Sequence, residues 1–526
     1  MRAEHIETLV SVGRPAVARD GSFAVFATSR PSIEANRPVG RLFRIELADH
    51  RMRPLTRGVS DSAPLLSPDD TRLAFLRADA KGKPQVWVVE ASGGEPVQVT
   101  DAPLGVRSFD WSPDGTRLAF TAPVPEPGRY GSVEGLDAQA EAPRRVTGLR
   151  WQANGLGWTT GRPAQVFVVD APDLGAEPLV DPAPVVRSAG ESAPDKRVVH
   201  REAVQLTDGT RSFSGSVFAP GGTEILTVPD EPDSSERDLS NVLLAIRVDG
   251  SGEREVIGRD RRLSLSGVAI ADDETIALLA AELPESATDF IAPGQALWIL
   301  VDGVPQRLTD PETIDLGEVG SHITAIGEDF LVQNRTRGRV ELLRVSRSGA
   351  VEQVLGGDLE VNGHGASEDG RILASVARPD TFGELVEVGG DTLTDFGAAL
   401  RDTGVVVPEE REITGRDGYP VHGWVAKPEG DGPFPVILQI HGGPYAQYGV
   451  HAFDETQVLV DAGYAVVYCN PADRRAMGAS TAAASAGPWA PWISTTSSTF
   501  SRASSPSTPR WTATGSASWA APTAAI

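Results

Sequence analysis

The residues with the clearest capacity for chemistry are His441-Gly442-Gly443-Pro444-Tyr445. They directly follow Val436-Ile437-Leu438-Gln439-Ile440, an apolar run typical of a buried central strand. Two adjacent glycines let a backbone approach a bound group closely. The plainer interpretation is a glycine turn at a strand end with no ligand. The residues alone leave both interpretations open.

The elements around this segment form the pattern of a parallel sheet. The stretch 412–425 predicts a hairpin that turns at Asp417-Gly418. The stretch 453–463 predicts a helix that ends at the glycine Gly463, and 464–471 predicts the next strand. Strand, glycine-rich loop, helix and strand together indicate a βαβ-type unit.

The first 400 residues have a different sequence pattern, in which one short motif, called the turn phrase below, recurs. The clearest copies are Ser67-Pro68-Asp69-Asp70 and Ser112-Pro113-Asp114-Gly115, 45 residues apart, and each leads into an apolar strand. Such a turn followed by an apolar run predicts a hairpin. All seven copies begin at Arg19, Ser67, Ser112, Ala219, Ala271, Ile326 and Ser367.

Further strands are predicted between the copies, for example at 85–89 and 165–169, and several lead to Leu-Thr or Val-Thr endings. Seven copies with about four short strands each predict an all-β seven-bladed β-propeller over residues 1–400. The interval from Gly115 to Gly221 is about twice as long as the others, which predicts an insertion within or after the third blade. The alternative is an array of β-sandwiches with coincidental turn phrases.

Composition excludes several classes of function. The formal charge of −24 argues against nucleic-acid binding, which needs clustered Lys and Arg. The single cysteine, Cys469, excludes an intramolecular disulfide and a cysteine-based zinc site. The chain has no apolar run of eighteen residues and no apolar leader, so we expect a cytoplasmic protein without a membrane partner.

From residue 405 onward the chain resembles the prolyl oligopeptidase family of serine peptidases, especially its acylaminoacyl-peptidase-like branch. The preceding propeller agrees with this resemblance. The matching residues are Asp417-Gly418, Gly423-Trp424, His441-Gly442-Gly443-Pro444, 462–467 and Asn470-Pro471. In that family a peptide is the substrate, no metal or organic cofactor takes part, and the propeller filters substrates by size.

The resemblance also implies a role for the glycine loop, which in the family lies beside the oxyanion hole. A backbone N–H of Gly443 or its neighbours would stabilise the oxyanion of the tetrahedral intermediate. We therefore expect His441, Gly442, Gly443, Pro444 and Tyr445 to form an oxyanion loop. His441 would order this loop and would not act as the catalytic base.

After Pro471 the resemblance stops. The residues 472–526 are rich in Ala, Ser, Thr and Pro and contain no Leu, Val, Glu, Lys or His. In α/β-hydrolases the catalytic order is Ser, then Asp or Glu, then His. The last histidine is His451, and no Gly-x-Ser-x-Gly follows it. We therefore predict a truncated α/β-hydrolase domain over 405–471 with no catalytic triad residue, and hence an inactive chain.

A shifted reading frame accounts for this tail. If each codon takes the last base of one printed codon and the first two of the next, 510–526 permits Val-Asp-Arg-Asp-Arg-Leu-Gly-Val-Met-Gly-Gly-Ser-Tyr-Gly-Gly-Tyr. That is the strand and nucleophile elbow expected at this point. The tail 472–526 is therefore interpreted as a non-native, out-of-frame and disordered segment.

Two further functions stay open at this point. A propeller can serve as a binding module with a vestigial hydrolase segment. The same scaffold can also carry an esterase, because serine hydrolase chemistry cleaves esters as well. The preferred cleavage site and the oligomeric state are not determined by the sequence.

Overall fold

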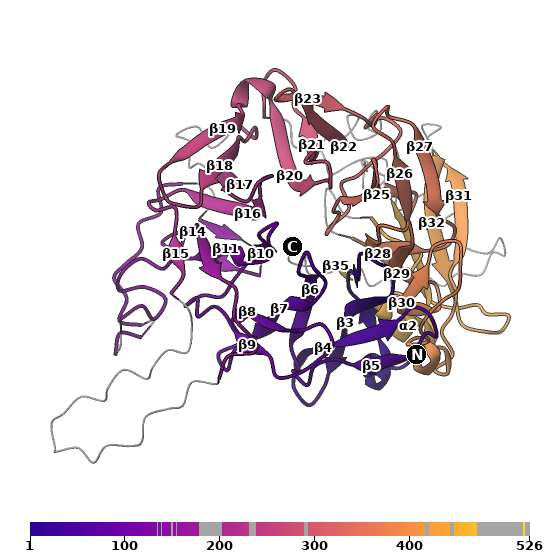
Figure 1. Ribbon diagram of the computed structural model, residues 1–526. Helices are drawn as coiled ribbons and strands as arrows, with labels where there is room; N and C mark the ends of the chain where they lie inside the picture. The colour runs from indigo at the N-terminus through magenta and orange to yellow at the C-terminus, as the bar shows by residue number, and fades with distance from the viewer. Residues whose placement is uncertain are drawn as a thin grey trace, which may run out of the picture.

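The molecule consists mainly of short antiparallel sheets that follow one another around a central space (Figure 1). The computed structural model describes residues 1–133, 135–137, 139–148, 151–153, 155–177, 202–230, 238–288, 293–415, 420–441, 447–470 and the backbone of 519–520. The sheets built from β1 to β30 are called the ring below. The last sheet, built from β31 to β35, is called the mixed sheet.

The first three sheets of the ring follow the chain in order. The first contains β1 (Ser11–Val12), β2 (Ala16–Val17), β3 (Phe23–Ser32), β4 (Arg37–Glu46) and β5 (Met52–Pro54). The second contains β6 (Asp61–Leu66), β7 (Arg72–Ala78), β8 (Pro84–Glu90) and β9 (Val97–Gln98). The third contains β10 (Ser108–Trp111), β11 (Arg117–Pro123), β14 (Ala164–Asp170) and β15 (Val204–Gln205).

The predicted insertion lies inside the third sheet. A small hairpin of β12 (Gln152–Ala153) and β13 (Gly157–Trp158) is inserted between β11 and β14. A second long connection joins β14 to β15. The strands predicted at 85–89 and 165–169 are confirmed as parts of β8 and β14.

The remaining sheets complete the ring. They contain β16 (Ser212–Phe218), β17 (Glu224–Asp230), β18 (Leu243–Arg247) and β19 (Glu253–Ile257), then β20 (Leu263–Ile270), β21 (Ile276–Glu282), β22 (Gln295–Val301) and β23 (Val304–Arg307). A larger sheet contains β24 (Thr324–Ile326), β25 (Asp329–Thr336), β26 (Arg339–Val345), β27 (Val351–Leu355), β28 (Glu360–Ala366), β29 (Ile372–Arg378) and β30 (Thr381–Glu387). Its β26 and β28 meet at a single parallel pair, Val340 with Glu360.

The recurring turn phrase forms the hairpins because its side chains bond to its own backbone. Ser112 Oγ donates to Asp114 Oδ1 at 2.6 Å, and the Thr116 N–H donates to the same oxygen at 3.0 Å. The hydrogen bond from Ser112 lowers the pKa of Asp114 to about 2. Gly115 has a φ of 68°, a conformation that favours glycine. The phrase thus fixes the β10–β11 turn locally, as the sequence predicts.

The threonines of the Leu-Thr and Val-Thr endings have a shared structural role. The hydroxyls of Thr100, Thr207 and Thr309 each accept the N–H of a neighbouring strand residue at 2.9 Å. The donors are Val86, Val166 and Leu297, in β8, β14 and β22. Each buried threonine therefore satisfies a backbone donor where the outer strand leaves the sheet.

Arginines tie each sheet to the next one. Arg72 donates to the Gly115 carbonyl oxygen at 2.7 Å, and Arg117 donates to the Gly222 oxygen at 2.9 Å. Arg371 of the last ring sheet reaches the carbonyl oxygen of Gly21 in the first sheet at 3.2 Å. The same contact that links successive sheets therefore also joins the last sheet to the first.

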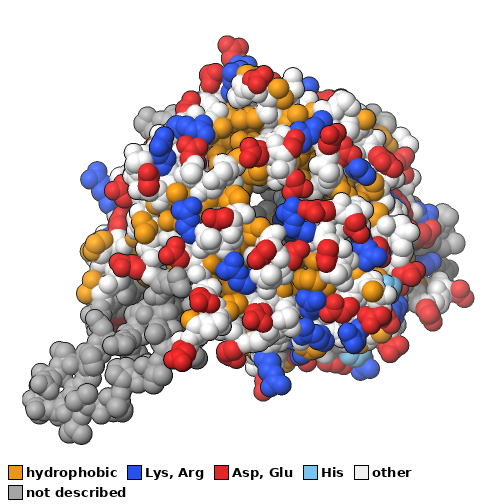
Figure 2. All heavy atoms as spheres, in the orientation of Figure 1, with side chains coloured by type: hydrophobic (Ala, Val, Ile, Leu, Met, Phe, Trp, Pro, Cys, Tyr) orange, Lys and Arg blue, Asp and Glu red, His pale blue; other side chains and the backbone are white. Residues whose placement is uncertain are grey.

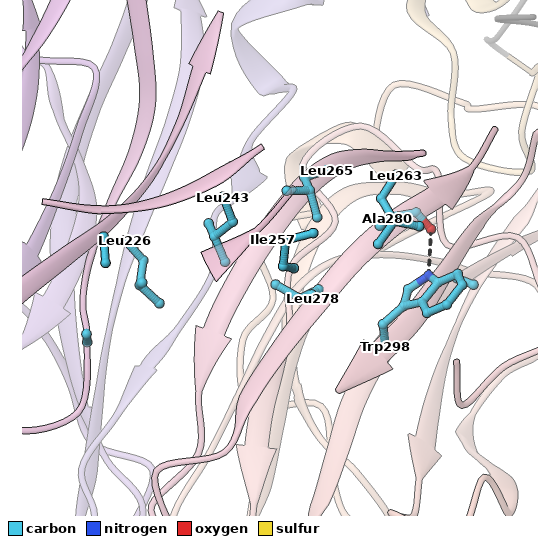
Figure 3. Packing of buried hydrophobic residues seen from close by; sticks show 11 residues of the cluster. Leu226, Leu243, Ile257, Leu263, Leu265, Leu278, Ala280 and Trp298 are labelled. Carbon is cyan, nitrogen blue, oxygen red and sulfur yellow. Dashed lines mark hydrogen bonds between the residues drawn. The ribbon is translucent and has the colours of Figure 1, made fainter. Parts of the chain in front are cut away.

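The core lies between sheets. Figure 3 shows one such cluster, in which Leu226 and Leu243 face Leu263 and Leu278. Trp298 closes this cluster and donates its indole N–H to the Ala280 carbonyl oxygen at 3.0 Å. Each large side chain buried in this way contributes about 1.5–3 kcal/mol. Packing between neighbours therefore stabilises the ring as a whole.

Two glycines let the N-terminal segment close the ring against the last sheet. A Cβ at Gly363 in β28 would lie 2.7 Å from Arg14 Cα, and one at Gly383 in β30 would lie 2.5 Å from Val12 N. Val12 packs in one cluster with Leu373 and Leu385. First and last sheets therefore share a core, although they lie far apart in the sequence.

The mixed sheet follows the ring after α1 (Ala398–Arg401). It contains β31 (Glu409–Thr414), β32 (Pro420–Ala426), β33 (Val436–Ile440), β34 (Ala465–Asn470) and β35 (Trp519–Ala520), in the spatial order β31-β32-β34-β33-β35. The helix α2 (Asp454–Asp461) joins β33 to β34, which pair in parallel. The predicted βαβ-type unit is thus confirmed, and Gly463 ends its helix with a φ of 94°.

The chain's N-terminus packs on the mixed-sheet side of the ring. The short helix η1 (Ala3–Thr8) carries Ile6 into a cluster with Met1, Leu400 and Ala452. A second short helix, η2 (Arg259–Arg261), follows β19. Within the described ranges, no helix has the length and apolar character needed to cross a membrane.

Candidate functional site

The predicted oxyanion loop begins at the carboxyl end of β33. His441 follows Ile440 directly, and its ring meets the Tyr448 ring edge-on at a centroid distance of 4.7 Å. Gly442, Gly443, Pro444 and Tyr445 lie outside the described residues. The structure therefore defines the two flanks of the loop, at His441 and from Gln447 onward.

Asn470 anchors the far flank of the loop. The Tyr448 N–H donates to Asn470 Oδ1 at 2.8 Å, and Asn470 Nδ2 donates to the Tyr448 carbonyl oxygen at 3.0 Å. Asn470 is fully buried at the end of β34. This paired bond fixes the chain that leaves the loop to the strand next to β33.

A second polar network holds α2 against β33. Thr456 Oγ1 donates to Gln439 Oε1 at 2.6 Å, and Gln439 Nε2 donates to Glu455 Oε2 at 3.1 Å. Gln439 and Thr456 are both buried. The helix after the loop is thereby held to the strand before it.

Aromatic rings pack beneath the loop flank. Trp424 stacks on Tyr468 at 5.4 Å, and Tyr468 contacts Tyr448 at 4.9 Å between centroids. Burial raises the pKa of both tyrosines above the ordinary value. Both phenols therefore stay protonated near neutral pH and cannot act as bases there.

The ring contributes directly to this site through the β25–β26 turn. The Gly338 N–H donates to Gln447 Oε1 at 3.0 Å, and the Val450 N–H donates to the Gly338 oxygen at 2.9 Å. Gly338 has a φ of 77°, and a Cβ there would lie 2.3 Å from Trp424. The turn thus fits against the loop flank only as glycine.

A second contact joins the start of β28 to the same flank. Glu360 Oε1 accepts hydrogen bonds from the His451 N–H at 3.0 Å and from His451 Nδ1 at 2.8 Å. Burial opposes ionisation of both side chains. The attraction between the Glu360 carboxylate and the His451 imidazolium, together with their hydrogen bonds, outweighs this effect of burial. The pKa of His451 is therefore raised and that of Glu360 is lowered. This contact is an ion pair at the junction of ring and mixed sheet.

A third contact joins β26 to the outer edge of the mixed sheet. Arg339 bonds to Glu410 at 2.7 Å, and Glu410 in turn contacts His422 Nε2 at 2.5 Å. The hydrogen bond from Arg339 lowers the pKa of Glu410 to about 2. Burial lowers the pKa of His422 below its ordinary value. Glu410 therefore stays ionised and serves as an acceptor for both partners.

An apolar cavity of about 350 Å³ lies beside the end of β33. It is lined mainly by Met1, Ile6, Ile437, Ile440, Tyr448 and Leu459. Within the part of the chain that the structure describes, no cluster of three or more His, Cys, Asp or Glu side chains could hold a metal ion. The described residues therefore place two held flanks, at His441 and from Gln447 onward, beside an apolar surface.

The sequence identified the loop itself but not the residues that hold it. Gly338 and Glu360 lie about a hundred residues from their partners and carry no local motif. Asn470 carried one weak signal, a polar residue before proline at the end of an apolar strand. Such pairings depend on how the ring meets the mixed sheet, which local patterns do not encode.

Comparison with known proteins identifies the class of this fold. No family model matches the chain. Its structure superimposes on the acylaminoacyl peptidase of Pyrococcus horikoshii with a TM-score of 0.74 at 18% identity, over 95% of this chain and 72% of that one. A puromycin hydrolase gives a TM-score of 0.63 at 17% identity, over 93% and 71% of the two chains. The fold is that of peptidases that join a propeller to a hydrolase domain.

Sequence comparison also finds relatives that are peptidases. The uncharacterized peptidase YuxL of Bacillus subtilis is 27% identical over 488 residues, which cover 89% of this chain and 70% of that protein. Dipeptidyl-peptidase 5 of Porphyromonas endodontalis is 28% identical over 128 residues, 24% of this chain and 18% of that protein. The sequence relatives of this chain thus include peptidases, and its fold is similar to those of an acylaminoacyl peptidase and a puromycin hydrolase.

Proposed function

We propose that the chain derives from a serine peptidase that hydrolyses short peptides or acyl-peptides. The observation that carries this proposal is the flank from Gln447 to Val450, between β33 and α2, which Asn470 of β34 and the Gly338 turn of the ring both hold. In α/β-hydrolases the loop in this position supplies an N–H to the oxyanion hole. His441 and Gly442 to Tyr445 would form that loop, with the N–H of Gly443 directed at the substrate oxygen.

The proposed architecture is a seven-bladed propeller over 1–400, a hydrolase segment over 405–471 and a non-native tail over 472–526. The single parallel pair between β26 and β28 divides the largest ring sheet into two blades, which supports the count. The strands β31 to β34 and the helix α2 lie within the proposed hydrolase segment, and β33 and β34 pair in parallel around that helix. In this architecture the ring covers the active site and restricts it to short peptides.

We further propose that the printed chain forms no acyl-enzyme, because it contains no elbow serine and no histidine after His451. The backbone of Trp519–Ala520 pairs in parallel with Gln439 and Ile440 of β33. The shifted frame reads the last residues before the elbow serine from these same codons. The strand Trp519–Ala520 departs from the prediction of a disordered tail over 472–526, and the rest of that tail lies outside the described residues.

A repaired gene tests the proposal. Restoring the shifted frame near codon 472 should yield an enzyme that cleaves N-acetylated peptide anilides and reacts with a fluorophosphonate probe. The matched control replaces the restored elbow serine by alanine, and we expect it to lose both signals. The printed chain should behave like this control. A repaired enzyme without activity or labelling would contradict the proposal.

A further inference from the structure

The ring encloses a central hollow, visible as a depression in the middle of Figure 2. Its wall consists of the innermost strands, and β10, β16, β20, β24 and β28 contact one another in this order. β2 contacts both β28 and β6 and so continues this wall through the first sheet to the second. Arg14 belongs to this wall, because it lies between β1 and β2 with its Cα against Gly363 of β28.

Arg14 carries an unpaired positive charge at this wall. Its side chain is exposed, and none of the described residues forms a hydrogen bond or ion pair with its guanidinium. Enclosure by the surrounding sheets lowers the pKa of Arg14 to about 10, so it stays charged at neutral pH. An enclosed guanidinium without a carboxylate partner is a candidate binding site for an anion.

The groups that face Arg14 come from three other parts of the wall. Its charge lowers the pKa values of His322 and His364, after the larger effect of burial, and His322 falls to about 3. These two rings stack at 4.0 Å and are neutral. Arg14 also acts on the carboxylate of Asp110 in β10, whose pKa burial raises to about 7 and the charge of Arg14 lowers in part. Asp110 is held by the Phe218 N–H at 3.0 Å and not by Arg14.

The position of Arg14 relates it to the candidate oxyanion loop. β28 begins at Glu360, which contacts the loop flank through His451. Gly363, against which Arg14 lies, is three residues further along, or roughly 10 Å at the rise of a strand. An extended peptide of about three to five residues spans a similar distance. A short peptide with one end near the mixed sheet can therefore bring its other end to Arg14.

We propose that Arg14 binds the C-terminal carboxylate of short peptides inside the hollow of the ring. This inference rests on the proposed peptidase function and names a determinant of its substrate class. Arg14 forms a charge-assisted pair with the carboxylate, while the neutral histidines provide a flat, uncharged wall. Asp110 opposes binding when ionised, because it places a second negative charge near the ligand.

The test measures binding, which requires no turnover. A tetrapeptide with an N-terminal fluorophore is titrated with the full 526-residue chain, once with a free C-terminus and once as its amide, and fluorescence anisotropy is recorded. We expect the free acid to bind about tenfold or more tightly than the amide. Arg14→Gln should weaken binding of the acid to the level of the amide, and Arg14→Lys should retain part of the preference. Asp110→Asn should tighten binding of the acid.

The matched control is Arg2→Gln, which removes an exposed arginine that pairs only with Glu4 in its own helix turn. It should leave both affinities unchanged. Equal binding of acid and amide by the unaltered chain would overturn the inference, and so would an Arg14→Gln variant that keeps the preference. Either result leaves the repaired-gene assay untouched, so failure of the carboxylate site and failure of the peptidase proposal are distinguishable.

Discussion

Single residues decide how the ring meets the mixed sheet, and the pair Glu360–His451 is the most sensitive to pH. The raised pKa of His451 contributes stability below its ordinary value of 6.5, and this contribution is lost as pH rises through the raised pKa. The lowered pKa of Glu360 contributes above its ordinary value of 4.5 and is lost as pH falls through the lowered pKa. The pair therefore stabilises most in the mildly acidic window between these values.

Glu360→Gln is expected to remove this pH dependence. At pH 5.5 to 6 we predict a loss of about 1–3 kcal/mol, because His451 would keep a weaker, uncharged acceptor. The difference in melting temperature between variant and parent should shrink toward pH 9 and again below pH 4. Differential scanning fluorimetry across this range measures it. A difference that stays constant with pH would show that the pair carries no charge in the folded state.

Asn470 gives a second prediction at this scale. Asn470→Ala leaves the Tyr448 N–H and carbonyl oxygen without partners in a buried position, at a cost of about 2–4 kcal/mol. Asn470→Asp keeps an acceptor for the N–H but buries a carboxylate against the Tyr448 carbonyl oxygen, so its loss at neutral pH should be at least as large and should shrink at acidic pH. Urea unfolding followed by tryptophan fluorescence measures both. Equal stability of the alanine variant and the parent would contradict the anchoring role.

At the scale of elements, the N-terminal segment closes the ring only because glycines face it. Gly363→Ala and Gly383→Ala would each place a methyl group within 2.7 Å of the segment's backbone, and we expect each to cost about 1–3 kcal/mol. Hydrogen exchange of residues 10–17 should accelerate in both variants. Gly13→Ala is the matched control, because its methyl group would lie 3.6 Å from the nearest atom. Unchanged exchange in the two variants would mean that another contact closes the ring.

The elements also define what the sequence could predict. The hairpin β10–β11 was predictable because Ser112, Asp114 and Gly115 fix their turn through neighbours within five residues. The unit β33–α2–β34 was predictable because an apolar run and a glycine stop mark its parts. The closure by Val12 and the contact of Gly338 with Gln447 were not predictable, since both join residues that lie more than a hundred positions apart.

At the candidate site, the loop is likewise marked by a local sequence pattern, whereas the residues that hold its flank lie far from it in the sequence. His441 and the glycines after it are a prediction from local composition, because a backbone that approaches a bound group closely favours adjacent glycines. Their supports come from the ring, and many different side chains could have served in their place. A sequence pattern therefore indicates the chemistry of the site more readily than the contacts that position it.

At the scale of the whole molecule, charge and fold act together. Acidic and basic side chains mix over the face seen in Figure 2, although the net charge is −24. Arginines fasten successive sheets through backbone oxygens, and one further arginine faces the central hollow. The ring also contacts the loop flank of the mixed sheet, through Gly338 and Glu360.

We propose that this molecule derives from a serine peptidase whose catalytic part is read out of frame after Pro471. Sequencing the gene from codon 460 past its present end tests this most directly. We predict that a correction of one or two bases near codon 472 restores Gly-Gly-Ser-Tyr-Gly-Gly and, downstream, an acidic residue and a histidine. A reading frame that stands as printed, or stop codons in the shifted frame between codons 472 and 526, would contradict the claim.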